Sequence, residues 1–388
     1  MTVRIGIIGA GVMGTDHARL LAGVVSGAAL TAVNDLDQRR AAAVAESAGS
    51  ARVLADPIEL INDDTVDAVV VASTDPTHER FVLASIDAGK PVLCEKPLAP
   101  TIEACLRILD AEVAYGRRLV TVGFMRRYDP GYVELKTILD SGGIGSALVL
   151  HCIHRNVSTI PGLYSGDVIT NSAVHEIDLA RWLLDDEIVA ASVHKPRPSR
   201  AGGGTQDTQI LILESAKGVL VDIEVFVNAR YGYDVRCELV GEEGCASLDS
   251  PPAIELRWAA AASRGLPGDW RPRFAEAYRR ELQDWVDGLR GDLASDGADG
   301  WDGYSATAIA HACVIALETN ARQEVKLVAK PDLYDRTASD GDYRTRPAGR
   351  PARSEPMFGP TPRVELDLGP RSRSTDALTG NSDGSFSG

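Results

Sequence analysis

The chain has 388 residues, of which 44% are hydrophobic and 24% are charged, and its formal net charge is −15. This length supports a sizeable core and about two or three domains. The acidic balance argues against nucleic acid and anionic membranes as partners and favours small ligands. The six cysteines lack C-x-x-C spacing, and no stretch is apolar for long enough to span a bilayer. We therefore expect a reduced, cytoplasmic protein.

A glycine-rich loop follows the first predicted strand, residues 3–8, and precedes a predicted helix. The loop consists of Gly9, Ala10, Gly11, Val12, Met13 and Gly14. In this G-x-G-x-x-G pattern Gly9 allows a tight turn, Gly11 lets the backbone approach a pyrophosphate, and Gly14 lets helix and strand pack closely. Free N–H groups at the start of the helix can bind the phosphates. The loop therefore predicts a dinucleotide site.

An acidic residue, Asp35, ends the second predicted strand, residues 30–34. It stands about 20 residues past the glycine motif, where a carboxylate can bond a ribose 2′-hydroxyl. Because a carboxylate there repels a 2′-phosphate, we expect NAD rather than NADP. Asp37 is a competitor for this role, and the alternative for Asp35 is the N-cap of a helix that begins near Gln38.

Apolar strands and amphipathic helices alternate up to residue 123, with further strands predicted at residues 67–73, 92–94 and 119–122. This alternation predicts a parallel sheet covered on both faces, that is, a doubly wound Rossmann domain over residues 1–123. Thr74 belongs to a turn and cap after one strand. His78 opens the next helix, where a capping or packing histidine is as plausible as a cofactor contact.

Glu95 and Lys96 stand at the C-terminal end of the strand at residues 92–94, just before Pro97. An open α/β sheet forms its ligand crevice at such strand ends. A lysine in a partly dry crevice can have its pKa lowered and can act on a hydroxyl proton. The alternative is an ordinary charge pair on the surface.

The second half, residues 124–330, has a different pattern. The predicted elements are a helix ending at 139, a strand at 147–154, a helix at 171–184, strands at 209–214, 219–227, 235–240 and 246–248, and helices at 274–289 and 304–319. The consecutive strands predict an antiparallel meander and an α+β domain with a largely antiparallel open sheet. Residues 331–388 are rich in Arg, Pro, Gly, Ser and Asp, and we predict a disordered tail there.

One stripe of the predicted helix 171–184 carries Asn171, His175 and Asp178. A histidine flanked one turn away by an amide and a carboxylate can have its tautomer fixed for proton transfer. The alternative is a buried histidine satisfied by its neighbours. His151 and His154 lie on a strand without the usual ligand spacing, so we predict no metal site.

Seven segments together resemble the Gfo/Idh/MocA family of oxidoreductases, and most closely its inositol branch. These segments are residues 9–14, 94–98, 122–129, 151–156, 174–178, 231–234 and 301–304. The resemblance covers residues 3–330. It implies a Rossmann domain followed by an α/β domain whose open sheet forms a homotetramer. It also implies NAD-dependent oxidation of a small polyol, myo-inositol, to 2-keto-myo-inositol.

The resemblance also implies roles for individual residues. Lys96 would hydrogen-bond the reacting hydroxyl, and His175 would take its proton. The other hydroxyls would be held by Arg126, Asn156, Asp178 and Tyr233. NAD would be held by Gly9, Gly11, Val12, Met13, Gly14, Asp35, Thr74, Glu95 and Lys96. An alcohol releases hydride readily only as its proton leaves, so a cation and a base must converge on one oxygen.

The chain departs from the family at Asn171, where an aspartate is usual. An amide can accept a hydrogen bond from His175 and orient it, but it cannot stabilise an imidazolium by charge. Two alternatives therefore stay open: a dehydrogenase for scyllo-inositol, chiro-inositol or a hexose, and a low-activity sensor that binds NAD and a polyol. The presence of both Lys96 and His175 argues against the sensor.

Overall fold

In the computed structural model, the described residues are 1–335 except 50, 161, 249–254, 259–260 and 292–296. Their first sheet contains β1 (Val3–Ile8), β2 (Ala28–Asn34), β3 (Arg52–Val53), β4 (Ala68–Val71), β5 (Val92–Glu95), β6 (Val120–Gly123) and β15 (Ala298–Asp299). The strand order is β15-β6-β5-β4-β1-β2-β3, and every pair except β15 with β6 is parallel. The order reverses between β1 and β4, where a doubly wound sheet opens its ligand crevice. The predicted Rossmann fold is confirmed.

The helices of the first half begin and end at the signals that local chemistry provides. They are α1 (Val12–Gly23), α2 (Gln38–Ser47), α3 (Pro57–Asn62), η1 (Asp75–Thr77), α4 (His78–Asp87) and α5 (Ile102–Tyr115). The Asp37 side chain caps α2 and the Thr101 side chain caps α5, each by accepting backbone N–H groups. Gly116 ends α5 in the left-handed conformation that glycine adopts at low cost. The short elements β3 and α3 were not predicted.

The second sheet contains β7 (Ala147–Arg155), β8 (Ile188–His194), β9 (Thr208–Ser215), β10 (Leu220–Phe226), β11 (Asp234–Gly241), β12 (Cys245–Leu248) and β16 (Gln323–Glu324). Its order is β12-β11-β7-β10-β9-β8-β16. The predicted meander is wrong at one point, because β7 lies between β10 and β11 and pairs with β10 in parallel. The other pairs are antiparallel, so the predicted fold class is confirmed. A further hairpin joins β13 (Glu255–Trp258) and β14 (Ala261–Arg264).

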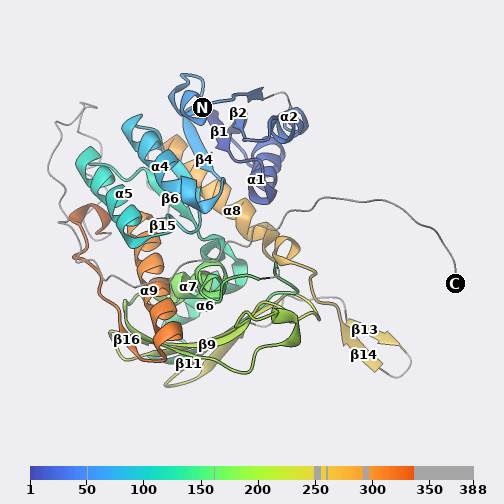
Figure 1. Cartoon of the computed structure of the whole chain (residues 1–388), viewed down its shortest axis with the longest axis vertical. Coiled ribbons are helices and arrows are strands. Elements are labelled where there is room, and N and C mark those ends of the chain that lie inside the picture. The colour runs from blue at the N-terminus through green and yellow to red at the C-terminus, as the bar shows by residue number, and fades with distance from the viewer. Residues whose placement is uncertain (50, 161, 249–254, 259–260, 292–296, 336–388) are drawn as a thin grey trace, which may run out of the picture.

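Helices cover one face of the second sheet and join it to the first (Figure 1). The helices of the second half are η2 (Met125–Tyr128), α6 (Pro130–Asp140), η3 (Val168–Ala173), α7 (Val174–Leu184), η4 (Arg200–Gly202), α8 (Trp270–Gly291), α9 (Gly300–Thr319) and η5 (Asp332–Tyr334). Residues along β9 alternate between buried and partly exposed, which is typical of a sheet packed on one face only. Among the described helices, none is long and apolar enough to cross a membrane.

The C-terminal part of the described chain returns to the first sheet. β15 pairs with β6, and the Tyr334 hydroxyl donates a 2.7 Å hydrogen bond to Glu112 Oε2 on α5. Tyr334 is fully buried. Residues 331–335 therefore do not fit the prediction of a disordered tail, because a buried tyrosine and its hydroxyl partner hold them. Residues 336–388, the rest of the predicted tail, lie outside the described residues.

The buried Glu112 makes stability depend on pH. Burial raises its pKa to about 7 from an ordinary 4.5, although Tyr334 and two backbone N–H groups lower it in part. The unfolded chain ionises this group above pH 4.5, so its contribution to stability is full below that pH and is lost as pH rises through 7. At about 1.4 kcal/mol per pKa unit, the free energy of unfolding of wild type is expected to fall by about 3 kcal/mol over this pH range. Glu112→Gln should not show this fall. Urea unfolding at pH 4.5 and 8 measures this, with Glu103→Gln at an exposed position of α5 as the control.

Candidate active site

The three glycines of the β1–α1 loop are each required for a different geometric reason. Gly9 has φ of +98°, and a Cβ there would lie 2.5 Å from the Ala72 carbonyl. A Cβ on Gly14 would lie 1.8 Å from the Gly9 oxygen, whereas one on Gly11 would meet no described atom within 4 Å. The open space before Gly11, together with an α1 N-terminus that no side chain caps, fits a pyrophosphate. Val12, more than half exposed, and Met13, partly buried, open α1 beside this space.

Gly11→Ala is expected to weaken NAD binding without weakening the fold. Alanine tolerates the negative φ of −69° at this position, but its methyl group occupies the space that a pyrophosphate needs. We expect the Kd for NAD to rise about tenfold, a loss of about 1.4 kcal/mol, and the melting temperature to stay unchanged. Gly23→Ala at the end of α1, where a Cβ also meets no described atom within 4 Å, is the matched control. An unchanged Kd in Gly11→Ala would contradict the predicted phosphate position.

Asp35 lies at the C-terminal end of β2, next to the glycine loop. Its Oδ2 accepts a 2.7 Å hydrogen bond from Ala10 N, and its Oδ1 accepts one from Asp37 N. The cap of α2 is Asp37 and not Asp35, so the helix-cap alternative for Asp35 is wrong. The carboxylate of Asp35 is therefore held beside the glycine loop, and its contact with the ribose of a dinucleotide stays a prediction.

Thr74 and His78 follow β4 at the same edge of the sheet. Thr74 is exposed and carries no side-chain cap bond to η1. His78 is buried, and its ring nitrogens lie 2.8 Å from the Pro97 carbonyl and 3.1 Å from the Ser73 carbonyl. His78 therefore packs the segment after Lys96 against the end of β4. This arrangement agrees with the packing role considered for this histidine.

Lys96 extends from the end of β5 towards the second half of the chain. Its Nζ donates a 3.0 Å hydrogen bond to the backbone carbonyl of Asn171. Desolvation lowers the pKa of Lys96, and the carboxylates of Glu95 and Asp75 oppose part of that effect. A lysine in this state is a hydrogen-bond donor whose proton is easier to move than that of an exposed lysine.

Glu95 belongs to the support of Lys96 and not to an open cofactor surface. It is buried, its Oε1 lies 2.7 Å from His17 Nε2 on α1, and its Oε2 accepts the Lys96 backbone N–H at 3.3 Å. Burial opposes ionisation, but His17 and Lys96 hold the pKa of Glu95 below its ordinary value. The Glu95 side chain is therefore turned towards His17, and a contact of this residue with NAD stays a prediction.

His175 lies at the start of α7, facing the end of the first sheet. It is 8% exposed, its ring packs edge-on against Phe124, and its Nδ1 has no hydrogen-bond partner among the described residues. Burial first, and then the charges of Lys96 and Arg126, lower the pKa of His175 well below 6.5. The imidazole is therefore neutral near pH 7 and can accept a proton.

The predicted contact between Asn171 and His175 is absent from the described part of the chain. Asn171 lies in η3, a π-helical turn, and its side chain is exposed. A π-helix bonds residue i to i+5, so the four-residue spacing that stacks side chains on an α-helix does not apply here. Asn171 contributes its backbone carbonyl to Lys96 instead, and any residue type has that carbonyl.

A buried polar cluster lies beside His175. Arg126 on η2 pairs with Glu176 through Nη1, and its Nη2 lies 3.2 Å from His154 Nδ1. His154 Nδ1 also lies 2.9 Å from Glu176 Oε2, and His154 Nε2 lies 3.2 Å from Asn156 Oδ1. Asn156 Nδ2 in turn donates to Ser172 Oγ at 3.4 Å. The structure thus joins the predicted Arg126 and Asn156 through two residues that were not predicted.

Tyr233 belongs to this cluster, but Asp178 does not. The Tyr233 ring packs edge-on against His154 and Phe274, and burial raises its pKa to about 12. Asp178 is 1% exposed, and both of its oxygens accept hydrogen bonds from Arg127, at 2.6 and 3.0 Å. The structure therefore places the Asp178 carboxylate against Arg127, away from this cluster, and a contact of Asp178 with a substrate hydroxyl stays a prediction.

Glu176, His154 and His17 are the residues that sequence reasoning missed. Glu176 directly follows His175, and His154 lies in a segment that supported the family resemblance. Their places in the sequence therefore gave only a weak indication that they belong to the site. Their partners lie 22 to 78 positions away, and no local pattern announces such pairs. Within the described part of the chain, no group of three His, Cys, Asp or Glu residues could hold a metal ion.

Known proteins match most of the chain. Residues 3–124 match the oxidoreductase family with an NAD-binding Rossmann fold, and residues 132–247 match the GFO/IDH/MocA C-terminal domain. Inositol 2-dehydrogenase 2 of Saccharopolyspora erythraea is 54% identical over 336 residues, which cover 86% of this chain and 98% of the relative. Inositol 2-dehydrogenase of Ralstonia nicotianae is 48% identical over 336 residues, with coverage of 86% and 99%.

A solved structure agrees with these matches. The crystal structure of myo-inositol dehydrogenase from Lactobacillus casei, in complex with NAD(H) and myo-inositol, has a TM-score of 0.83 and 36% identity. The match covers 86% of this chain and 100% of that one. The family models, the relatives and the solved structure therefore agree, and the chain belongs to the Gfo/Idh/MocA family of NAD-binding oxidoreductases.

Proposed function

We propose that this protein oxidises myo-inositol to 2-keto-myo-inositol with NAD as hydride acceptor. The observation that carries the proposal is the position of Lys96, which bonds the Asn171 carbonyl four residues before the neutral His175. The buried cluster of Arg126, His154 and Asn156 lies beside this histidine. Relatives named inositol 2-dehydrogenase, at 48% and 54% identity over nearly their whole length, support the same substrate.

The chain's own residues supply the proton chemistry. Lys96 would donate a hydrogen bond to the reacting hydroxyl oxygen and stabilise the negative charge that develops on it. His175 would accept the hydroxyl proton, which its depressed pKa and free Nδ1 or Nε2 lone pair permit. NAD on the glycine loop would supply the hydride acceptor. Asp35 and the free start of α1 fit the ribose and pyrophosphate of that cofactor.

The polar cluster would select the polyol. Arg126, His154, Asn156 and Tyr233 offer several donors and acceptors within one buried group. A substrate that lacks a matching hydroxyl leaves such groups unpaired, which strongly disfavours its binding. The same groups could also read scyllo-inositol, chiro-inositol or a hexose, and this is the second candidate.

We also propose a homotetramer built on the open face of the second sheet. The side chains of Ile153, Ile210 and Ile212 stay partly exposed there, next to the charged Glu224. A broad sheet face with apolar side chains is suited to packing against a second copy. Sedimentation equilibrium measures the assembly directly. The free thiols among the described residues fit a reducing compartment, so we propose the cytoplasm as location.

The test of the proposed function is NADH formation by the purified protein. Myo-inositol, scyllo-inositol, chiro-inositol and glucose are compared, each with NAD and with NADP. The highest kcat/KM with myo-inositol and NAD is expected, because Asp35 repels a 2′-phosphate. A preference for another polyol selects the second candidate. NAD binding without turnover of any polyol rejects the enzyme and favours the sensor.

A further inference from the structure

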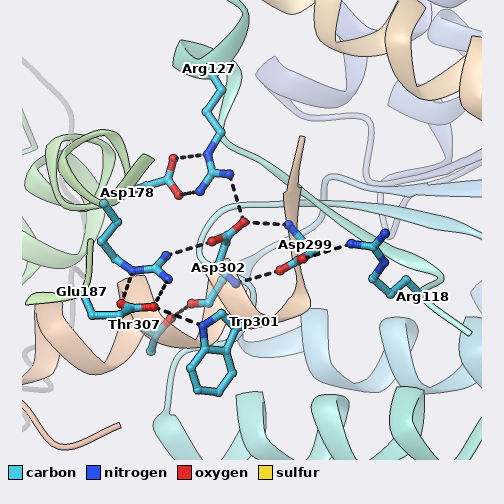
Figure 2. Close-up of polar contacts among 10 residues, drawn as sticks. Arg118, Arg127, Asp178, Glu187, Asp299, Trp301, Asp302 and Thr307 are labelled. Carbon is cyan, nitrogen blue, oxygen red and sulfur yellow. Dashed lines mark hydrogen bonds and ion pairs between the residues drawn. The ribbon is translucent and has the colours of Figure 1, made fainter. Parts of the chain in front are cut away.

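Three residues from different elements, none of them used in the proposed reaction, meet in one buried network (Figure 2). Arg127 comes from η2, Asp178 from α7 and Asp302 from the first turn of α9. Arg127 donates to Asp178 from Nε and Nη2, at 3.0 and 2.6 Å, and to Asp302 from Nη1 at 2.9 Å. One guanidinium therefore joins two carboxylates from helices that are distant in sequence.

The network continues from Asp302 along the start of α9. Asp302 Oδ1 accepts a 2.9 Å hydrogen bond from Arg181 Nη1, and Arg181 binds both oxygens of Glu187 at 2.7 Å. Asp302 and Asp299 bind each other's backbone N–H groups in a capping box. Asp299 lies in β15, the strand that pairs with β6.

These contacts close a ring of elements that consists of β6, η2, α7, α9 and β15. β6 leads directly into η2, which carries Arg126 next to Arg127. Arg127 binds Asp178, which lies one turn after His175 on α7, and Asp302 leads back through β15 to β6. The ring thus links the first sheet, which carries Lys96, to the helix that carries His175.

The burial of the network makes its geometry strict. The side chains of Arg127 and Asp178 are 4% and 1% exposed. A buried charge that loses its partner is strongly destabilising, and the planar guanidinium fixes the direction of each carboxylate it binds.

We propose that Arg127, Asp178 and Asp302 are positioning residues, whose network sets His175 and Arg126 relative to Lys96. The proposed function assigns none of them to substrate or cofactor. The proposal rests on the proposed function for its kinetic consequence, because a displacement of about 1 Å at a reacting centre can lower the rate about 100-fold.

The kinetic test uses Asp178→Asn and Asp302→Asn, with Asp67→Asn as the matched control. Asp67 also accepts two side-chain hydrogen bonds from one arginine, Arg4. It directly precedes β4, however, and so lies at the N-terminal ends of the parallel strands, whereas the candidate site lies at their C-terminal ends. We expect kcat to fall about 10- to 100-fold in the first two variants, with an unchanged KM for NAD. The control should keep wild-type kcat. A thermal melt first establishes that each variant is folded. If Asp178→Asn does not fold, the kcat values of Asp302→Asn and Arg127→Lys test the proposal instead.

A second measurement does not depend on the substrate. Hydrogen–deuterium exchange of folded protein is expected to rise in residues 124–128 and 168–184 of Asp302→Asn and to stay unchanged in those of Asp67→Asn. Unchanged exchange in both segments, or a kcat loss that the control shares, overturns the proposal. Wild-type protein without turnover on any polyol rejects the proposed function instead, and the exchange result still decides whether the network positions α7 and η2.

Discussion

Lys96→Met is expected to lower kcat about 1,000-fold while the Kd for NAD changes less than about fivefold. Methionine keeps the length and much of the packing of lysine but has no N–H donor and no charge. The reacting hydroxyl would then lose the group that stabilises its developing negative charge. Steady-state NADH formation with myo-inositol gives kcat, and quenching of intrinsic fluorescence gives the Kd.

The matched control for this change is Lys90→Met. Lys90 is also a partly buried lysine whose Nζ donates to a backbone carbonyl, that of Asp63 at 2.7 Å. Desolvation lowers its pKa, as it does for Lys96. Lys90 precedes β5, however, and so lies at the N-terminal ends of the parallel strands, whereas the candidate site lies at their C-terminal ends. We expect wild-type kcat in this control, and a Lys96→Met variant with more than about a tenth of wild-type kcat would contradict the assigned role.

His175→Gln is expected to lower kcat about 100- to 1,000-fold and to remove the acid limb of the pH profile. Glutamine has a similar reach and can hydrogen-bond, but it cannot take the hydroxyl proton. In wild type the base must be neutral, and its pKa lies well below 6.5, so kcat/KM should begin to fall only below that pH. The depressed pKa of Lys96 places the alkaline limb below pH 10.5.

The control for this prediction is His194→Gln at the exposed end of β8. It should keep both the wild-type kcat and the acid limb. If His175→Gln retains the acid limb at the wild-type pH, another group is the base and the assignment is wrong. Measuring kcat/KM from pH 5 to 10 for wild type and both variants distinguishes these outcomes.

Local sequence was sufficient for the features that depend on neighbouring residues. The glycine spacing of the β1–α1 loop predicted its turn, its phosphate space and its close packing, and Asp35 stands beside that loop as expected. The β–α alternation predicted the parallel sheet, because strands buried on both faces are apolar throughout. Lys96 lies at a strand end for the same reason, since the end of an apolar run is visible in sequence.

Only the tertiary structure decided the features that depend on distant partners. β7 inserts between β10 and β11, although four consecutive strands alone favour a meander, because strand order depends on contacts across the sheet. Asp178 faces Arg127, 51 positions away, and helical periodicity cannot distinguish this partner from a substrate. The π-helical turn at Asn171 changes the number of residues per turn, so Asn171 and His175, four residues apart, do not stack as they would on an α-helix. Buried charges are placed by partners that supply their hydrogen bonds, and sequence distance does not reveal those partners.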